Sequence, residues 1–133
     1  KLIELANKPY IKRLSILGGE PLADENLDGV LHLVNRFRLS FPNKSIWLYS
    51  GFRWEECQPF NEDGLLKPDK FAPNLQKILQ KRYEVISRCN VMVDGRYIDS
   101  QRNPSKKWAG SDNQRVINIQ ESLKQGKVVL YCD

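Results

Sequence analysis

Three short apolar runs, each ending at or beside a glycine, constrain most strongly what this chain can fold into. They are "LSILGG" at 14–19, "SIWLYSG" at 45–51 and "NVMVDG" at 90–95. Short apolar runs bounded by glycine are typical of buried strands. Two longer segments with helical spacing of apolar residues lie between them. Because strands that alternate with helices build a parallel sheet, the sequence predicts an α/β fold.

The two helical segments each present one apolar face. The first lies within "LADENLDGVLHLVNRFRLSFP" (22–42), with Asp24 as its expected N-cap and Pro42 at its end. The second is "NLQKILQKRYEVISRC" (74–89). Beyond the third run we expect a short strand in "RVINIQ" (115–120), a helical turn in "ESLKQG" ending at Gly126, and a last strand in "KVVLY" (127–131).

Nothing in the remaining segments divides the chain into domains. The stretch "QPFNEDGLLKPDKFAP" (58–73) has three prolines and a glycine, which favours an irregular excursion. At 133 residues the chain is therefore expected to form a single domain, 1–133. Its start, "KLIELANKP", has the spacing of the end of an amphipathic helix without a cap. We expect a fragment whose beginning is missing.

Composition narrows the functional classes. Hydrophobic residues make up 41% and charged residues 28%, as in globular proteins. The net charge of +5 does not favour a nucleic-acid partner, because pairs such as Lys12-Arg13 and Lys106-Lys107 fall on separate predicted elements. No stretch approaches the ~20 apolar residues of a membrane helix, and no export signal precedes the first strand. We expect a soluble, cytoplasmic protein without a membrane partner.

The cysteines and the one histidine offer no local catalytic or metal-binding motif. Cys57, Cys89 and Cys132 are odd in number and far apart, which fits neither a disulfide framework nor a metal knuckle. His32 lies within a predicted helix with no metal-ligand spacing beside it, so we interpret it as structural. The chain also lacks the GxGxxG and GxxxxGK[ST] phosphate-binding motifs.

The residues that follow the three strands are the best candidates for a site, because working groups lie at the carboxyl ends of parallel strands. Glycines there give a ligand access to the backbone, and Glu20 adds a negative charge that suits an ammonium group. The candidates are Gly18, Gly19, Glu20 and Pro21, then Ser50 and Gly51, then Asp94, Gly95 and Arg96.

Structural alternatives exist for each candidate. Gly-Gly followed by proline is common in turns, and "VDGRYI" alone resembles a type I′ hairpin turn. Asn113 and Gln114, in "WAGSDNQ", can bind a small ligand or cap their own loop.

The ordered set "LSILGGEPL", "IWLYSGF", "NVMVDGRYID" and "NPSKKWAGSDNQRVI" resembles the anaerobic ribonucleoside-triphosphate reductase activating proteins, which are radical S-adenosylmethionine enzymes. The resemblance covers nearly the whole chain. It implies a partial (β/α) barrel that holds a 4Fe-4S cluster and S-adenosylmethionine. It also implies reductive cleavage of that cofactor, with removal of a hydrogen atom from a glycine in the glycyl-radical loop of the reductase large subunit, and an electron donor such as flavodoxin.

By motif match, the resemblance assigns cofactor binding to the strand ends. Gly18, Gly19, Glu20 and Pro21 would hold the methionyl amino group, Ser50 and Gly51 occupy the next strand end, and Asp94, Gly95, Arg96 and Asn113 complete the set. No catalytic and no metal-ligating residue is assigned within this chain.

One departure from the family pattern is the absence of a CxxxCxxC loop. The spacing of the three cysteines cannot replace it, so we expect the first strand and the cluster loop to lie upstream in a longer parent protein. The chain itself is then expected to bind no cluster and to perform no cleavage. The alternative is a non-catalytic α/β binding or interaction module that kept the scaffold and lost the cluster.

Overall fold

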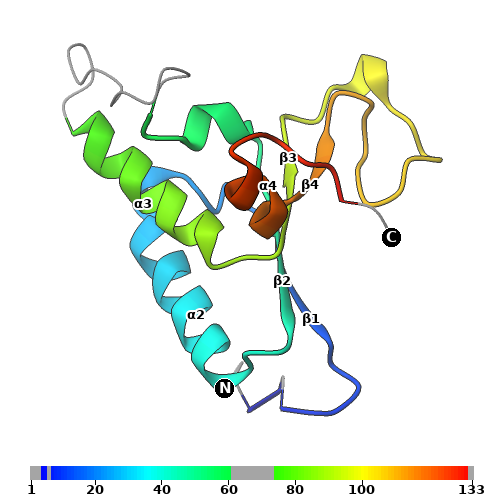
Figure 1. Cartoon of the computed structure of the whole chain (residues 1–133). Coiled ribbons are helices and arrows are strands. Elements are labelled where there is room, and N and C mark those ends of the chain that lie inside the picture. The colour runs from blue at the N-terminus through cyan, green and yellow to red at the C-terminus, as the bar shows by residue number, and fades with distance from the viewer. Residues whose placement is uncertain (1–3, 6, 61–73, 132–133) are drawn as a thin grey trace.

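Four strands form one sheet in the part of the chain that this computed structural model describes, residues 4–5, 7–60 and 74–131. They are β1 (Arg13–Ile16), β2 (Ser45–Tyr49), β3 (Val91–Asp94) and β4 (Arg115–Asn118), in the order β1-β2-β3-β4. β1 pairs with β2 and β2 with β3 in parallel, whereas β4 pairs antiparallel with β3 (Figure 1). The predicted α/β fold with a mainly parallel sheet is confirmed.

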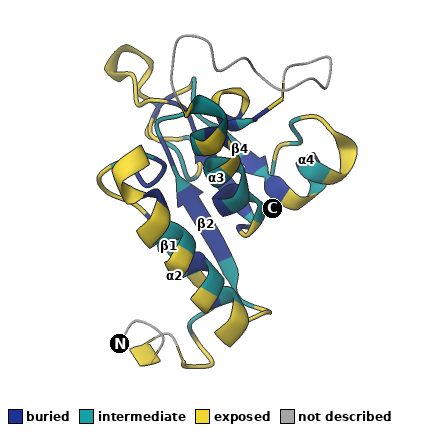
Figure 2. Ribbon diagram, turned by 90° about the vertical axis from the view of Figure 1, so that its left-hand side faces the viewer, coloured by how far each residue is buried: buried dark blue, intermediate teal, exposed yellow. Residues whose placement is uncertain are grey.

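Two long helices cover one face of this sheet. α2 (Leu27–Ser40) connects β1 to β2, and α3 (Leu75–Ser87) precedes β3, while the shorter α4 (Ile119–Gln125) follows β4. Their inner faces are buried and their outer faces exposed, as the apolar spacing predicts (Figure 2). α4 ends at Gly126, which has a φ of 70° and caps the helix as expected.

Alternate residues of the strands serve two different cores. Toward the helices, Ile16, Leu48 and Met92 pack with α2 and α3 residues such as Phe37 and Ile86. On the opposite face lies a smaller cluster with aromatic residues: Trp47, Val91, Val93, Tyr49, Trp108, Ala109, Val116 and Tyr131. The period of two along each strand explains the separation. The sheet is therefore covered by helices on one face and by loops on the other.

Two expectations at element ends are wrong. Asp24 makes no capping bond, because the chain enters α2 through the 3-10 turn η1 (Asp24–Asn26). The segment 127–131 forms only an isolated bridge, Ile117 to Leu130, and not a strand. The structural alternative of a hairpin turn at Gly95 does not form, since residues 95–114 separate β3 from β4.

Two other expectations fall mostly outside the described residues. These are the helix end at the start of the chain, where 1–3 and 6 are not described, and the excursion at 58–73, where 61–73 are not. No helix among the described residues has both the length and the apolar character to cross a bilayer.

A pair of substitutions on α2 tests how this helix faces the sheet. Phe37 is fully buried and Leu39, two residues on, is 84% exposed. Phe37→Ala is expected to lower the free energy of unfolding by about 3–5 kcal/mol because it leaves a cavity, whereas Leu39→Ala changes it by less than about 0.5 kcal/mol. Urea unfolding followed by circular dichroism measures both. Equal losses would contradict the packing of α2.

Candidate functional site

A cavity of about 310 Å³ lies where the three parallel strands end. Eight of the ten residues predicted as a site line it: Gly18, Gly19, Glu20, Pro21, Ser50, Gly51, Gly95 and Arg96. Tyr49, Val93, Tyr97 and Gln114 complete the lining. Residues from three distant segments therefore meet at one edge of the sheet.

The carboxylate of Glu20 joins the ends of β1 and β2. Its Oε2 accepts hydrogen bonds from the hydroxyl of Ser50 at 2.8 Å and from the backbone N–H of Leu22 at 2.9 Å. Its Oε1 accepts one from the N–H of Gly51 at 2.6 Å. A Cβ at Gly51 would lie 3.3 Å from Oε1, so glycine allows the close approach. A carboxylate has about four acceptor positions, which leaves one for a ligand.

Gly18 and Gly19 turn the chain sharply out of β1. Their φ angles are 71° and 34°, in the left-handed region that favours glycine. No atom lies within 4 Å of the place where a Cβ would stand at either residue. The backbone on this side of the cavity is therefore open to a ligand.

Asp94 does not line the cavity. It is 1% exposed, and its carboxylate accepts hydrogen bonds from the guanidinium of Arg115, at 2.5 Å and 3.1 Å, and from the N–H of Trp54 at 2.7 Å. Arg115 also pairs with Glu55 at 2.7 Å. The two carboxylates raise the pKa of Arg115, and the hydrogen bond from Arg115 lowers that of Glu55. Asp94 thus fixes the end of β3 to β4 and to η2 (Trp54–Cys57).

Asn113 also lies behind the cavity and supports its wall. Its Nδ2 donates to the carbonyl of Arg96 at 2.7 Å, while the side chain of Gln114 donates to the carbonyl of Gly95 at 3.0 Å. Both amides hold the loop that carries Arg96. The ring of Tyr97 extends this wall and packs against Gly110, where a Cβ would come within 3.0 Å of the ring.

Sequence reasoning missed Arg115, Glu55 and the lining residue Tyr97. Arg115 lies 21 residues from Asp94 and 60 from Glu55 along the chain, so no local spacing connects them. One signal in the sequence could have indicated the ion pair of Arg115 with Asp94. Arg115 begins the predicted strand that follows the "VDGR" strand along the chain, and opposite charges on neighbouring strands can pair.

The described cysteines do not fit the ligands of an iron–sulfur cluster. Cys57 and Cys89 are both buried on the helix side of the sheet. Desolvation raises the pKa of each thiol to about 12, so neither supplies a thiolate at neutral pH. In the part of the chain that the structure describes, no three His, Cys, Asp or Glu side chains are grouped to hold a metal ion. Cys132 lies outside the described residues.

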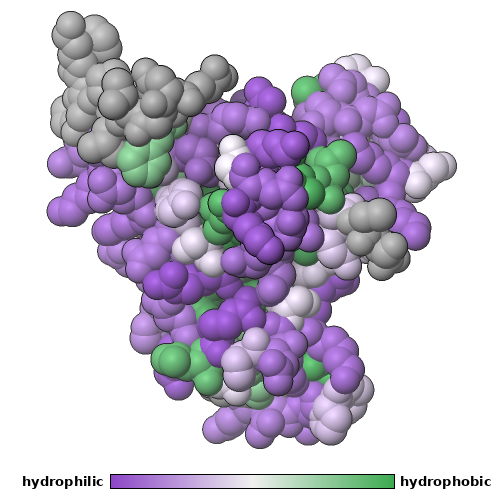
Figure 3. Space-filling model, in the orientation of Figure 1, coloured by the Kyte–Doolittle hydropathy of each residue, from purple (hydrophilic) through white to green (hydrophobic). Residues whose placement is uncertain are grey.

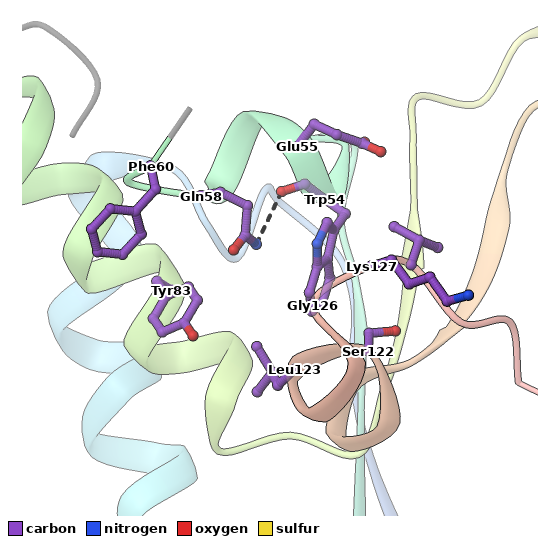
Figure 4. A pocket seen from close by; sticks show the side chains of 10 residues that line it. Trp54, Glu55, Gln58, Phe60, Tyr83, Ser122, Leu123, Gly126 and Lys127 are labelled. Atoms are coloured by element: carbon purple, nitrogen blue, oxygen red, sulfur yellow. Dashed lines mark hydrogen bonds between the residues drawn. The ribbon is translucent and has the colours of Figure 1, made fainter. Parts of the chain in front are cut away.

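A larger cavity of about 520 Å³ lies between η2, α3 and α4 (Figure 4). The rings of Trp54, Phe60 and Tyr83 and the side chain of Leu123 form its walls. None of the residues predicted as a site lines this cavity. The N–H of Trp54, one of its lining residues, donates to the carboxylate of Asp94 behind the candidate site.

Comparisons with known proteins agree with the resemblance seen in the sequence. Residues 1–117 match the family model described as a 4Fe-4S single cluster domain. The chain is 31% identical over 121 residues to the anaerobic ribonucleoside-triphosphate reductase-activating protein of Escherichia coli K12, covering 90% of this chain and 65% of that protein. It is 32% identical over 111 residues to the protein of the same name from phage T4, covering 83% and 55%.

The chain thus spans about 55–65% of the length of these relatives. No solved structure matches the chain.

Replacing Asp94 tests whether it is a structural clamp. Asp94→Asn leaves Arg115 without its buried partner and is expected to cost about 2–3 kcal/mol of unfolding free energy, less than a fully buried pair because Arg115 keeps some exposure. The control Glu55→Gln removes only the exposed partner and should cost less than about 1 kcal/mol. Chemical denaturation at pH 7 measures both.

The small contribution of Glu55 to the free energy of unfolding should be lost as the pH falls below its ordinary pKa of 4.5, because its pKa is lower in the folded protein than in the unfolded chain.

An Asp94→Asn variant as stable as the wild type would contradict the role of Asp94 as a structural clamp.

Proposed function

The chain belongs to the 4Fe-4S single cluster domain family, and on this premise we propose that it forms the S-adenosylmethionine-binding part of an activating protein for anaerobic ribonucleoside-triphosphate reductase. The relatives from Escherichia coli K12 and phage T4 are both named as activating proteins of this reductase. The proposal extends the activity to this chain and assigns its cofactor to the cavity at the strand ends.

The observation that carries the proposal is the pair of opposite charges on this cavity. Glu20 and Arg96 both line it, and they come from the ends of β1 and β3. An amino acid carries an ammonium and a carboxylate on one carbon, so a methionyl group is complementary to this pair. The free acceptor position of Glu20 would take the ammonium, and the guanidinium of Arg96 would take the carboxylate.

The other predicted residues divide into contacts and supports. The open backbone at Gly18 and Gly19 would lie against the ligand, because no side chain occupies that space. Ser50 and Gly51 act through Glu20, whose carboxylate they hold in place. Asp94 and Asn113, which sequence analysis assigned to cofactor binding, would act as positioning residues from behind the wall.

The chemistry that the cofactor would supply there, with an electron from a 4Fe-4S cluster, is reductive cleavage of S-adenosylmethionine and removal of a hydrogen atom from a glycine of the reductase. We propose a single domain with the partial (β/α) barrel of radical S-adenosylmethionine proteins, which the strand order and parallel pairing support. The glycyl-radical loop of the reductase large subunit is the proposed partner, and flavodoxin the type of electron donor.

The cluster of the family is not expected to be held by this chain. Cys57 and Cys89 are buried, burial raises the pKa of both thiols, and neither residue lines the cavity. We therefore propose that the residues of this chain bind and orient the cofactor but do not cleave it on their own.

Binding of S-adenosylmethionine to the purified chain tests the site. Isothermal titration should detect binding by the wild type, and Arg96→Gln should weaken it about tenfold because a charged contact to the carboxylate is lost. Arg102→Gln is the matched control, since Arg102 is exposed in the same loop but does not line the cavity. The absence of binding, or an equal loss in both variants, would contradict the proposal.

Anaerobic reconstitution with iron and sulfide tests the claim about the cluster. We expect no 4Fe-4S absorbance and no electron paramagnetic resonance signal above the level of a Cys57→Ser/Cys89→Ser variant, which reports adventitious iron. Because both described thiols are buried and belong to no group of three metal ligands among the described residues, the two proteins should behave alike. A stoichiometric cluster in the wild type would overturn this part of the account.

A further inference from the structure

A third cavity, of about 510 Å³, lies at the opposite end of the sheet from the candidate site. The residues that line it are Tyr10, Ile11, Lys12, Arg13, Ser45, Trp47 and Tyr131, and we call this set the basic hollow. Arg13 and Ser45 begin β1 and β2, whereas Gly18 and Ser50 follow the ends of the same strands. A ligand in the basic hollow would therefore leave the candidate site free.

Arg13 is held in place by an aromatic ring and not by an acid. Its guanidinium carbon lies 4.3 Å from the centroid of the Trp47 ring. Trp47 is itself fixed, because Trp108 and Tyr131 pack edge-on against it at centroid distances of 5.4 Å and 5.2 Å. Stacking on a fixed ring orients the guanidinium and leaves its N–H groups free at the edge.

These N–H groups have no acceptor within the part of the chain that the structure describes. Arg13 is exposed, and it takes part in none of the side-chain hydrogen bonds or ion pairs found among the described residues. A planar guanidinium with free N–H groups matches an anionic group with two adjacent oxygens, such as a carboxylate or a phosphate, which it binds through two parallel hydrogen bonds.

The two segments that supply most of the basic hollow carry only positive charges. The segments 7–13 and 41–47 contain Lys8, Lys12, Arg13 and Lys44 and no Asp or Glu. The two segments lie side by side, because the N–H of Ser45 donates to the carbonyl of Lys12 at 3.0 Å and Lys44 Nζ donates to the carbonyl of Lys8 at 2.9 Å. The fold thus gathers basic residues that the sequence places on separate predicted elements.

The face of the molecule that Figure 3 shows is largely hydrophilic. The space-filling view shows hydrophobic residues only in small separate patches, including at the end where β1 begins (Figure 3). The exposed aromatic residue of the basic hollow is Tyr10, which is 73% exposed. An aromatic ring beside basic side chains suits a polar peptide better than an apolar helix.

We propose that the basic hollow binds an acidic segment of a partner protein, with one carboxylate paired to Arg13. A nucleic acid fits less well, because single strands bind by stacking successive bases on several rings. Trp47 is 4% exposed and lies under Arg13, which leaves Tyr10 as the exposed ring of the basic hollow. This inference does not depend on the proposed cofactor site.

Fluorescence anisotropy with a fluorescein-labelled hexaglutamate peptide tests the proposal at 150 mM salt. The wild-type chain should bind the peptide, and Arg13→Gln should weaken binding at least about fivefold because the paired contact is lost. Arg13→Lys should lose most of that affinity, since lysine keeps the charge but not the planar group. Arg36→Gln, at an exposed position on α2, is the matched control and should change binding less than about twofold.

Three outcomes would overturn the proposal. They are no peptide binding by the wild type, equal effects of Arg13→Gln and Arg36→Gln, and tighter binding of an oligothymidylate of the same charge than of the peptide. Circular dichroism of each variant verifies that it is folded. Titration of the same variants with S-adenosylmethionine reports on the candidate site, so that a change in peptide binding at the basic hollow is distinguished from a change in cofactor binding.

Discussion

One carboxylate, that of Glu20, holds the carboxyl ends of β1 and β2 together, and the candidate site depends on it. It accepts hydrogen bonds from Leu22, Ser50 and Gly51, so the two strand ends are fixed relative to one another. The same carboxylate retains an acceptor position toward the cavity. A single side chain therefore both builds the site and gives it a negative charge, which explains why an acid stands directly after two glycines.

The carboxyl end of β3 is fixed by a different set of interactions. Asp94 binds Arg115 and the N–H of Trp54, so β3, β4 and η2 are joined behind the cavity. The Asp94 carboxylate is buried and satisfied, while Arg96, two residues on, is exposed on the cavity wall. The "VDGR" segment thus provides a buried anchor, Asp94, and an exposed cation, Arg96, separated by the positive-φ turn at Gly95.

The sequence predicted the convergence of the three strand ends, because parallel strands place their carboxyl ends at one edge. It did not predict that Asp94 faces the helices. Asp94 is turned away from the cavity because its carboxylate binds Arg115 and the N–H of Trp54, partners that lie far from it along the chain. Contacts between distant segments, such as Arg115 with Glu55 and Arg13 over Trp47, depend on tertiary packing that no local pattern encodes.

The two ends of the sheet therefore carry different chemistry, with the opposite charges of Glu20 and Arg96 at one end and the basic hollow at the other. A crystal structure of the chain with S-adenosylmethionine tests the central claim most directly. The account predicts that the methionyl ammonium lies against Glu20 and the carboxylate against Arg96. A ligand bound instead in the cavity walled by Trp54 and Tyr83, with the strand ends empty, would contradict it.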